Sequence, residues 1–199
     1  MSNLIPVQLG ARSYAIHLGA GLLETLGPLS RERVRGRNCL VVSDGHVQPL
    51  YGARAADSLR AAGFTVSTAV VPPGEASKSS AQLLALYDTA VRVGLDRSGC
   101  MVALGGGVVG DLAGFLAATY LRGVALVQAP TTLLAMVDSS VGGKTGINLP
   151  AGKNLVGAFH QPALVVADLA TLQTLPEREG RAGLAEVVKY GAIRDAALF

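Results

Sequence analysis

The chain has 199 residues, of which half are hydrophobic and 16% are charged. This composition is too apolar for a disordered chain, and the length allows one sizeable core with part of a second domain. The formal net charge of +3 comes from scattered basic residues without interleaved stacking aromatics, which argues against nucleic acid as a partner.

The first part of the chain predicts a hairpin, a strand and a helix. Short β-rich runs over residues 4–9 and 13–18 flank Gly10 and predict an opening β-hairpin. Residues 39–43 predict a buried strand. The helix is expected from apolar residues at helical spacing and a closing glycine, namely Leu50, Ala55, Leu59, Ala62 and Gly63.

The next strand is predicted over residues 64–71, and Ser77 or Ser79 can cap the helix that follows it. The apolar face of that helix is expected to carry Leu83, Leu86 or Tyr87, and Ala90.

A glycine-rich loop then lies between a strand and a helix. Residues 100–104 predict the strand, residues 111–120 predict the helix, and residues 124–128 predict the strand after it. A further short helix can be capped by either of two adjacent threonines, Thr131 or Thr132.

This order predicts an α/β fold class, a Rossmann-like, mostly parallel sheet with helices on both faces, over residues 1–175. Within it, residues 142–154 are expected to form a turn-rich stretch and residues 163–167 a last strand. Residues 176–199 predict the first helix of an all-α C-terminal domain, which is expected to be truncated because the apolar helical pattern has no cap.

Four polar or glycine-rich segments follow the central strands, at residues 44–45, 74–78, 105–111 and 130–132. Ligands of parallel sheets bind beyond the carboxyl ends of the strands, where these segments should meet. We therefore expect a binding site at this edge.

The loop Gly105-x-Gly107-x-x-Gly110 has the strand–helix context of a dinucleotide fingerprint. Glycines let the backbone approach a pyrophosphate, and a helix N-terminus offers free N–H groups. A glycine turn used only for tight packing is the alternative. Asp44 could hold a ribose, and Asp111, expected on the first helical turn, could bind a cofactor hydroxyl or amide.

Lys144 and Lys153 lie in glycine-rich turns, where they could neutralise a phosphate or carboxylate, or could be ordinary solvated surface lysines. Glu186 and Lys189 are three residues apart on the last helix, as in a surface ion pair or a buried site. The histidines are too far apart to predict a metal site by spacing: His17, His46 and His160.

Cys39 and Cys100 each begin an apolar run and are expected to be buried free thiols. The N-terminus has no basic stretch followed by an apolar core, and no apolar run reaches the ~20 residues that span a bilayer. We therefore expect a cytoplasmic protein without a membrane partner.

Several motifs, taken in order, resemble the 3-dehydroquinate synthase family of sugar-phosphate cyclases. They are Pro73-Gly74-Glu75-x-x-Lys78, the segment from Gly105 to Phe115, Tyr120-Leu121-Arg122-Gly123, the segment from Pro130 to Ser140, Gly142-Gly143-Lys144-Thr145, the segment from Gly152 to Gly157, and Leu184-Ala185-Glu186-Val187-Val188-Lys189. The resemblance covers nearly the whole chain.

The resemblance implies NAD as a cofactor and zinc or cobalt as a metal. The NAD contacts it implies are Asp44, Glu75, Lys78, Gly106, Gly107, Val108, Val109, Gly110, Asp111, Thr131, Thr132, Lys144, Lys153, Thr171, Leu172, Gln173 and Thr174. The substrate and catalytic residues it implies are Asp138, Lys144, Lys153, Asn154, Lys189 and Arg122, the last of which could act across a homodimer interface. Glu186 matches the carboxylate metal ligand, and the two histidine ligands of the family are not in this chain.

The implied reaction converts a phosphorylated seven-carbon sugar acid, 3-deoxy-D-arabino-heptulosonate 7-phosphate, into 3-dehydroquinate and phosphate, a step of the shikimate pathway to aromatic amino acids. The alternatives are another sugar-phosphate cyclase, of the 2-deoxy-scyllo-inosose or valiolone type, and a metal-dependent polyol dehydrogenase. The 199 residues alone are expected to bind NAD without turnover, because the metal site is incomplete.

Overall fold

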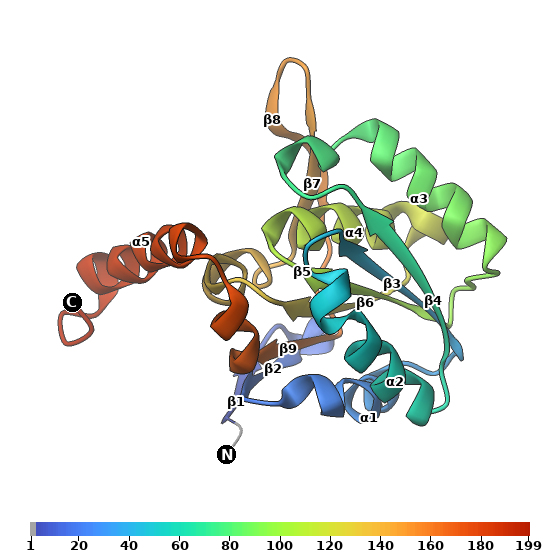
Figure 1. Ribbon diagram of the computed structural model, residues 1–199, viewed down its shortest axis with the longest axis horizontal. Helices are drawn as coiled ribbons and strands as arrows, with labels where there is room; N and C mark the ends of the chain where they lie inside the picture. Colours follow the sequence, from blue (N-terminus) through green and yellow to red (C-terminus); the bar gives the residue numbers. More distant parts are fainter. Residues whose placement is uncertain (1–2) are drawn as a thin grey trace.

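A seven-stranded sheet forms the centre of the computed structural model, which describes residues 3–199 (Figure 1). The edge strand is antiparallel to its neighbour and every other neighbouring pair is parallel. This confirms the predicted Rossmann-like α/β fold. In spatial order the strands are β1 (Asn3–Val7), β2 (Tyr14–Gly19), β9 (Leu164–Asp168), β6 (Ala125–Pro130), β5 (Cys100–Gly105), β3 (Asn38–Asp44) and β4 (Thr65–Val71).

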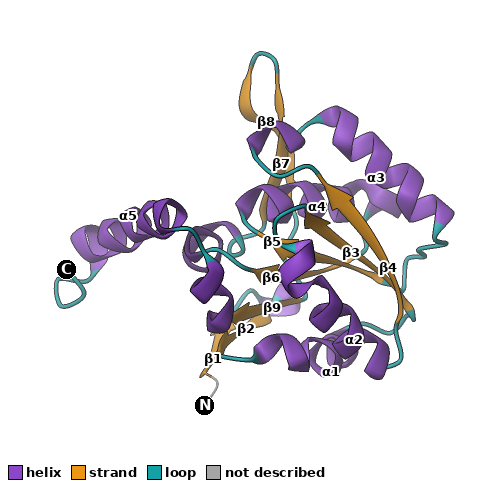
Figure 2. Ribbon diagram, viewed as in Figure 1, coloured by secondary structure: helices purple, strands orange, loops and turns teal. Residues whose placement is uncertain are grey.

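Helices cover both faces of this sheet (Figure 2). Side chains of β5 alternate between the faces, so that Met101 and Ala103 pack under one pair of helices while Val102 and Leu104 pack under the other. The first pair is α3 (Ser80–Arg92) and α4 (Gly107–Thr119), and the second is α1 (Leu26–Arg33) and α2 (Ala53–Ala61).

Two cysteines occupy registered positions on neighbouring central strands. Cys39 of β3 lies opposite Cys100 of β5, and both side chains are buried with free thiols. This confirms the expectation of buried free cysteines, which here serve as small apolar side chains between the sheet and the helices.

The stretch expected to be turn-rich is a second, two-stranded sheet. β7 (Lys144–Leu149) and β8 (Gly152–Phe159) form an antiparallel hairpin that projects from the body in Figure 1. Its glycines hide the strand pattern because they allow close backbone approach: a Cβ at Gly157 would lie 2.0 Å from the Thr145 carbonyl oxygen. The hairpin root packs on α4, where a Cβ at Gly114 would lie 2.4 Å from Cγ2 of Thr145.

Two helix predictions need correction. α4 begins at Gly107, not at residue 111, so Asp111 lies in the second turn and the first turn holds no acid. Leu50 is 54% exposed, because it lies in the π-helical turn η3 (Gln48–Gly52) ahead of α2, and it is not a core residue. Glycines tolerated at a helix start concealed the first boundary, and a local turn shifted the second.

α1 has no counterpart in the sequence prediction. Its eight residues carry a proline and several charges, so no apolar stripe marks it. Tertiary packing holds it against α2 instead: the Gly27 amide donates to Ser58 Oγ at 2.9 Å, and a Cβ at Gly27 would lie only 1.9 Å from the Ser58 carbonyl oxygen.

The predicted caps are resolved by the structure. The Ser79 hydroxyl accepts from the Gln82 amide at the start of α3, so Ser79 is the cap and Ser77 is not. Thr132 accepts from the Ala135 amide at 3.2 Å and thereby begins the short segment that ends in the π-helical turn η6 (Ala135–Ser139).

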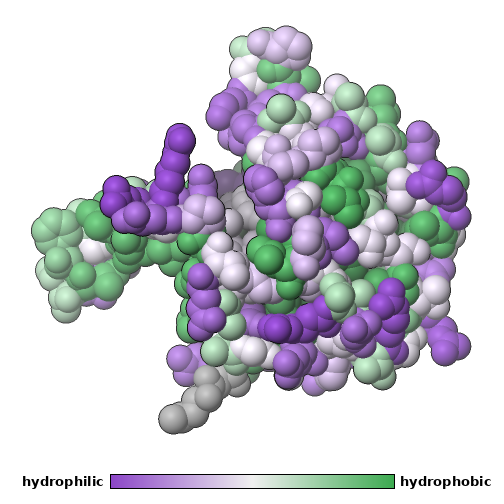
Figure 3. All heavy atoms as spheres, in the orientation of Figure 1, coloured by the Kyte–Doolittle hydropathy of each residue, from purple (hydrophilic) through white to green (hydrophobic). Residues whose placement is uncertain are grey.

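α5 (Glu177–Arg194) lies to one side of the sheet and exposes much of its apolar surface (Figures 1 and 3). It contacts the body near η6 through Gly183, where a Cβ would lie 2.7 Å from the Leu134 amide nitrogen. The helix begins close to the domain boundary expected after residue 175, which stays a prediction. Among residues 3–199, none of the helices has the length and apolarity required for a membrane span.

Candidate nucleotide and substrate site

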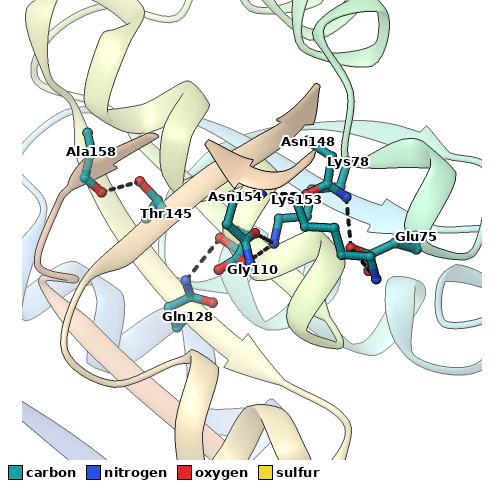
Figure 4. Close-up of polar contacts among 10 residues, drawn as sticks. Glu75, Lys78, Gly110, Gln128, Thr145, Asn148, Lys153, Asn154 and Ala158 are labelled. Carbon is teal, nitrogen blue, oxygen red and sulfur yellow. Dashed lines mark hydrogen bonds and ion pairs between the residues drawn. The ribbon is translucent and has the colours of Figure 1, made fainter. Parts of the chain in front are cut away.

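Three segments far apart in the sequence meet at the carboxyl edge of the sheet. Lys78 Nζ lies 2.5 Å from Asp111 Oδ2. It also lies 2.5 Å from Asn154 Oδ1, and Lys78 and Asn154 are labelled in Figure 4. Lys78 precedes α3, Asp111 lies in α4 and Asn154 lies in β8. The lysine is only 5% exposed, so its ammonium is hydrogen-bonded to these two acceptors in place of water.

A second polar arm extends from this cluster to Glu75 in the short 3-10 turn η4 (Glu75–Ser77). Glu75 Oε1 accepts from Asn148 Nδ2 at 2.8 Å and lies 3.4 Å from Lys153 Nζ. The Lys153 side chain is 71% exposed, so this ion pair contributes little stability. It still places the ammonium beside the loop that follows β4.

Glu75 and Asp111, two carboxyl groups of the site, have pKa shifts in opposite directions. Burial raises the pKa of Asp111 above its ordinary value, although the Lys78 ammonium opposes the shift, while Glu75 and Asp138 add to it. The hydrogen bond from Asn148 lowers the pKa of Glu75, and Lys153 and Lys78 add to that lowering.

An NMR titration of the Asp111 carboxyl in this chain is expected to give a pKa above about 3.9, the ordinary Asp value. Because the folded-state pKa is raised, the stability that the protonated group contributes below its ordinary pKa declines as the pH rises through the folded value. A pKa at or below the ordinary value would mean that attraction to Lys78 outweighs the cost of burial.

A cavity of about 560 Å³ opens beside Asp111 and Asn154, between α4, the hairpin and η6. Two of the predicted substrate residues, Asp138 and Lys144, line it as well. Its walls therefore combine two acids, an amide and a cation with apolar parts of the hairpin, as expected for a polar ligand of small-molecule size. The other lining residues are Ser139, Val141, Thr145, Gly146, Leu155, Gly157, Ala158 and Phe159.

The glycine-rich loop fits a bound dinucleotide phosphate. The first turn of α4 has no side-chain cap, so its backbone N–H groups are available to an anion. A Cβ at Gly106 would lie 3.1 Å from Thr132 Cγ2, and one at Gly107 would lie 3.0 Å from Ser139 Oγ. Among the described residues the buried hydroxyls of Thr131 and Ser139 have no hydrogen-bond partner, which leaves them free for a ligand.

Two members of the loop face the core. Val109 is 1% exposed and packs where Gly105 leaves room for it, since a Cβ at Gly105 would lie 2.8 Å from Val109 Cβ. Gly110 is buried against Gln128, whose Nε2 donates to the Gly110 carbonyl at 3.3 Å (Figure 4). Only their backbones can contribute to a cofactor site, whereas Val108 is partly exposed.

Several predicted residues do not line the cavity. Asp44 Oδ1 accepts from the His46 amide at 2.8 Å and so caps the turn after β3. Tyr51 donates to the Thr171 carbonyl and hydrogen-bonds the Thr174 hydroxyl, which secures the 3-10 segment η7 (Leu169–Thr174), including Leu172 and Gln173. Arg122 is exposed, with a positive φ of 65°.

Glu186 and Lys189 form an ion pair on α5, away from the Lys78 cluster. The Glu186 side chain is 17% exposed, so the pair is not a fully solvated surface contact. Within residues 3–199 no three His, Cys, Asp or Glu side chains come together in a metal-binding group. Glu186 is thus a single carboxylate here and does not by itself form a metal site.

Two polar residues near the site, Asn148 and Gln128, were not predicted from the sequence. Asn148 joins Glu75, Lys78 and Asn154, and Gln128 is a buried polar residue on the central strand β6. An amide inside an otherwise apolar strand was the available signal for Gln128. For Asn148 no local signal existed, because its partners lie in segments that only the fold brings together.

The fold and its glycine-rich carboxyl edge define a Rossmann-like α/β domain of the dinucleotide-binding class. A family model described as 3-dehydroquinate synthase N-terminal matches residues 68–182. The chain belongs to the 3-dehydroquinate synthase family.

Individual relatives agree with this assignment. The chain is 61% identical over 190 residues to the 3-dehydroquinate synthase of Symbiobacterium thermophilum, covering 95% of this chain and 53% of that protein. The chain therefore spans about half the length of the curated relatives it matches.

Solved sugar-phosphate cyclases share the fold. A 2-deoxy-scyllo-inosose synthase complexed with carbaglucose-6-phosphate, NAD+ and Co2+ matches with a TM-score of 0.87 and 32% identity, over 94% of this chain and 50% of that one. A 2-epi-5-epi-valiolone synthase from Streptomyces hygroscopicus with NAD+ and Zn2+ bound matches with a TM-score of 0.82 and 31% identity, over 98% of this chain and 52% of that one.

Proposed function

We propose that this chain is the NAD-binding part of an enzyme that converts 3-deoxy-D-arabino-heptulosonate 7-phosphate into 3-dehydroquinate and phosphate. The observation that carries the proposal is the Lys78 cluster, in which one buried ammonium joins Asp111 of the glycine-loop helix to Asn154 beside the cavity. A cofactor and a substrate could therefore be held against each other at this edge. The names of the curated relatives support the choice of reaction.

The cofactor side of the proposal rests on the glycine-rich edge. Backbone N–H groups of Gly107 and Val108 would face a pyrophosphate, and the buried hydroxyl of Thr131 would donate to the same ligand. When bound, NAD would accept a hydride from a ring carbinol and later return it. Further contacts proposed to NAD are Asp44, Glu75, Lys78, Gly106, Val109, Gly110, Asp111, Thr132, Lys144, Lys153, Thr171, Leu172, Gln173 and Thr174.

The substrate side rests on charges around the cavity. Lys144 would neutralise a phosphate or carboxylate of the substrate, and Asp138 and Asn154 would accept from or donate to its hydroxyls. Lys153 would add a second cation at the rim. Asp111 forms an ion pair with Lys78 and compensates the charge of that buried ammonium, so the attraction for a substrate anion would come from Lys144 and Lys153.

The proposal also includes a metal ligand, a homodimer and a cellular location. Glu186 would supply one carboxylate ligand to a zinc or cobalt ion, with Lys189 beside it, but a single donor is too few to hold the ion and carries no step of the reaction. Arg122 is exposed and would reach the substrate phosphate across the interface of a homodimer. A cytoplasmic location belongs to the same proposal.

The test measures phosphate release and dehydroquinate formation from the heptulosonate phosphate, with NAD and zinc, by the complete gene product. We expect both products without accumulation of NADH, because a cyclase returns the hydride. Accumulated NADH would favour a polyol dehydrogenase, and no phosphate release would exclude the proposed reaction.

Calorimetric titration of the 199-residue chain with NAD is expected to show binding without turnover. Absence of binding would contradict the cofactor half of the proposal.

A further inference from the structure

Asn148 lies where the ladder between β7 and β8 is interrupted. Ile147 pairs with Val156 and Leu149 pairs with Gly152, so Asn148 alone stands opposite residues 153–155. Such irregularities bend a strand and redirect side chains, often next to active sites. Here the backbone N–H of Asn148 bonds outside the hairpin, to the Lys78 carbonyl.

Three polar groups of Asn148, its backbone N–H and the side-chain atoms Nδ2 and Oδ1, form hydrogen bonds with residues of the candidate site. Its backbone N–H donates to the Lys78 carbonyl at 2.8 Å, and its Nδ2 donates to Glu75 Oε1 at 2.8 Å. Its Oδ1 accepts from the Asn154 backbone N–H at 2.9 Å. One asparagine thus ties the loop that follows β4 to the bulged part of β8 (Figure 4).

The contact with Asn154 holds that residue in an uncommon backbone conformation. Asn154 has a φ of 58°, in the left-handed region that asparagine enters more readily than most residues but still at a cost. With the backbone held this way, Asn154 Oδ1 lies 2.5 Å from Lys78 Nζ. Releasing the backbone would let the amide turn away from the lysine.

We propose that Asn148 is a positioning residue that sets Asn154 on the substrate side and Glu75 on the cofactor side, and so couples the two halves of the site. The inference rests on the proposed function, because it assigns NAD to one half and the sugar phosphate to the other. Asn148 does not line the cavity. It therefore acts through Asn154, Glu75 and Lys78.

Two replacements of Asn148 separate its contact with Asn154 from its contact with Glu75. Asn148→Ala removes both side-chain hydrogen bonds. Asn148→Asp keeps an oxygen that accepts from the Asn154 amide, but it loses the donor to Glu75 and sets a second carboxylate beside it. The control is Asn38→Ala, which removes a side-chain hydrogen bond of the same chemical type, from Asn38 to the Gly94 carbonyl at 2.7 Å, at the amino edge of the sheet.

The experiment compares these variants in the complete protein, measuring kcat, the KM of the heptulosonate phosphate, the Kd of NAD and the Tm. Asn148→Ala is expected to raise both the Kd and the KM by about fivefold to tenfold, as for loss of single hydrogen bonds. Asn148→Asp is expected to raise the Kd at least as much while its KM stays within about twofold of the wild type. Asn38→Ala is expected to change neither constant.

Equal effects of the two replacements on both constants, or no effect of either, would overturn the inference. A fall in Tm with proportional loss of all activity would mean that Asn148 only stabilises the hairpin. A wild-type protein that binds NAD without releasing phosphate would contradict the proposed function instead. In that case the NAD affinities of the two variants still decide whether Asn148 positions Glu75.

Discussion

Replacing Lys78 with methionine is expected to weaken NAD binding by at least about tenfold and to lower the stability of the protein by about 3 kcal/mol. The buried ammonium has two partners, Asp111 Oδ2 and Asn154 Oδ1, each at 2.5 Å. Methionine keeps the length and apolar stem of the side chain but removes the charge. Asp111, whose side chain is only 20% exposed, is then left without its cation.

The pKa of Asp111 gives a second readout of this change. Burial already raises that pKa, and the lysine is the main group that opposes it, so Lys78→Met is expected to raise the pKa further. Calorimetry with NAD, thermal unfolding and NMR titration measure the three effects. The control is Arg60→Met, which removes an exposed ion pair with Asp57 on α2 and is expected to change none of them. An unchanged NAD affinity in Lys78→Met would contradict the proposed role of Lys78 in NAD binding.

Replacing Asp168 with alanine is expected to destabilise the protein by about 3–5 kcal/mol. This carboxylate is 1% exposed at the end of β9. Its oxygens accept from the backbone amides of Gly21 at 2.7 Å, Leu23 at 3.0 Å and Ala170 at 2.9 Å. Alanine leaves these donors without an acceptor, and the segment after β2 loses its attachment to β9.

Thermal unfolding measures this effect, with an expected fall in Tm of roughly 6–20 °C for a protein of this size. Asp168→Asn is expected to recover only part of the loss, because one of its two side-chain atoms is a donor facing backbone donors. Asp57→Ala removes an exposed carboxylate of the same type and is the matched control. A fall of less than about 2 °C in Asp168→Ala would show that water or a neighbouring group replaces the carboxylate.

The central strands could be predicted from the sequence because parallel strands are buried on both faces. Residues of β5, such as Met101 and Val102, therefore form a continuous apolar run. α1 could not be predicted, since Gly27 packs on α2 by close backbone approach and not by an apolar stripe. The hairpin was hidden for the same reason, by glycines that replace side chains at crossing points.

Some residues of the candidate site could be predicted from the sequence, and others could not. Lys78 and Asp111 follow strand ends, and the topology of a parallel sheet suffices to bring such residues together. Asn148 depends on where a ladder irregularity falls, which is decided by contacts between distant segments. Val109 is a contrasting case, because it lies within the loop motif while its side chain is buried in the core. A motif locates a backbone more reliably than it locates side chains.

The glycine contact between α5 and the body has a mechanical consequence. With no side chain at Gly183, the helix rests directly on residues 133–134. These residues lead into η6, whose last residue, Ser139, faces the Gly107 position of the glycine-rich loop. A rotation of α5 would therefore change the contact between Gly183 and residues 133–134. The helix that carries Glu186 therefore touches the same segment, residues 133–139, whose other end lies against the glycine-rich loop.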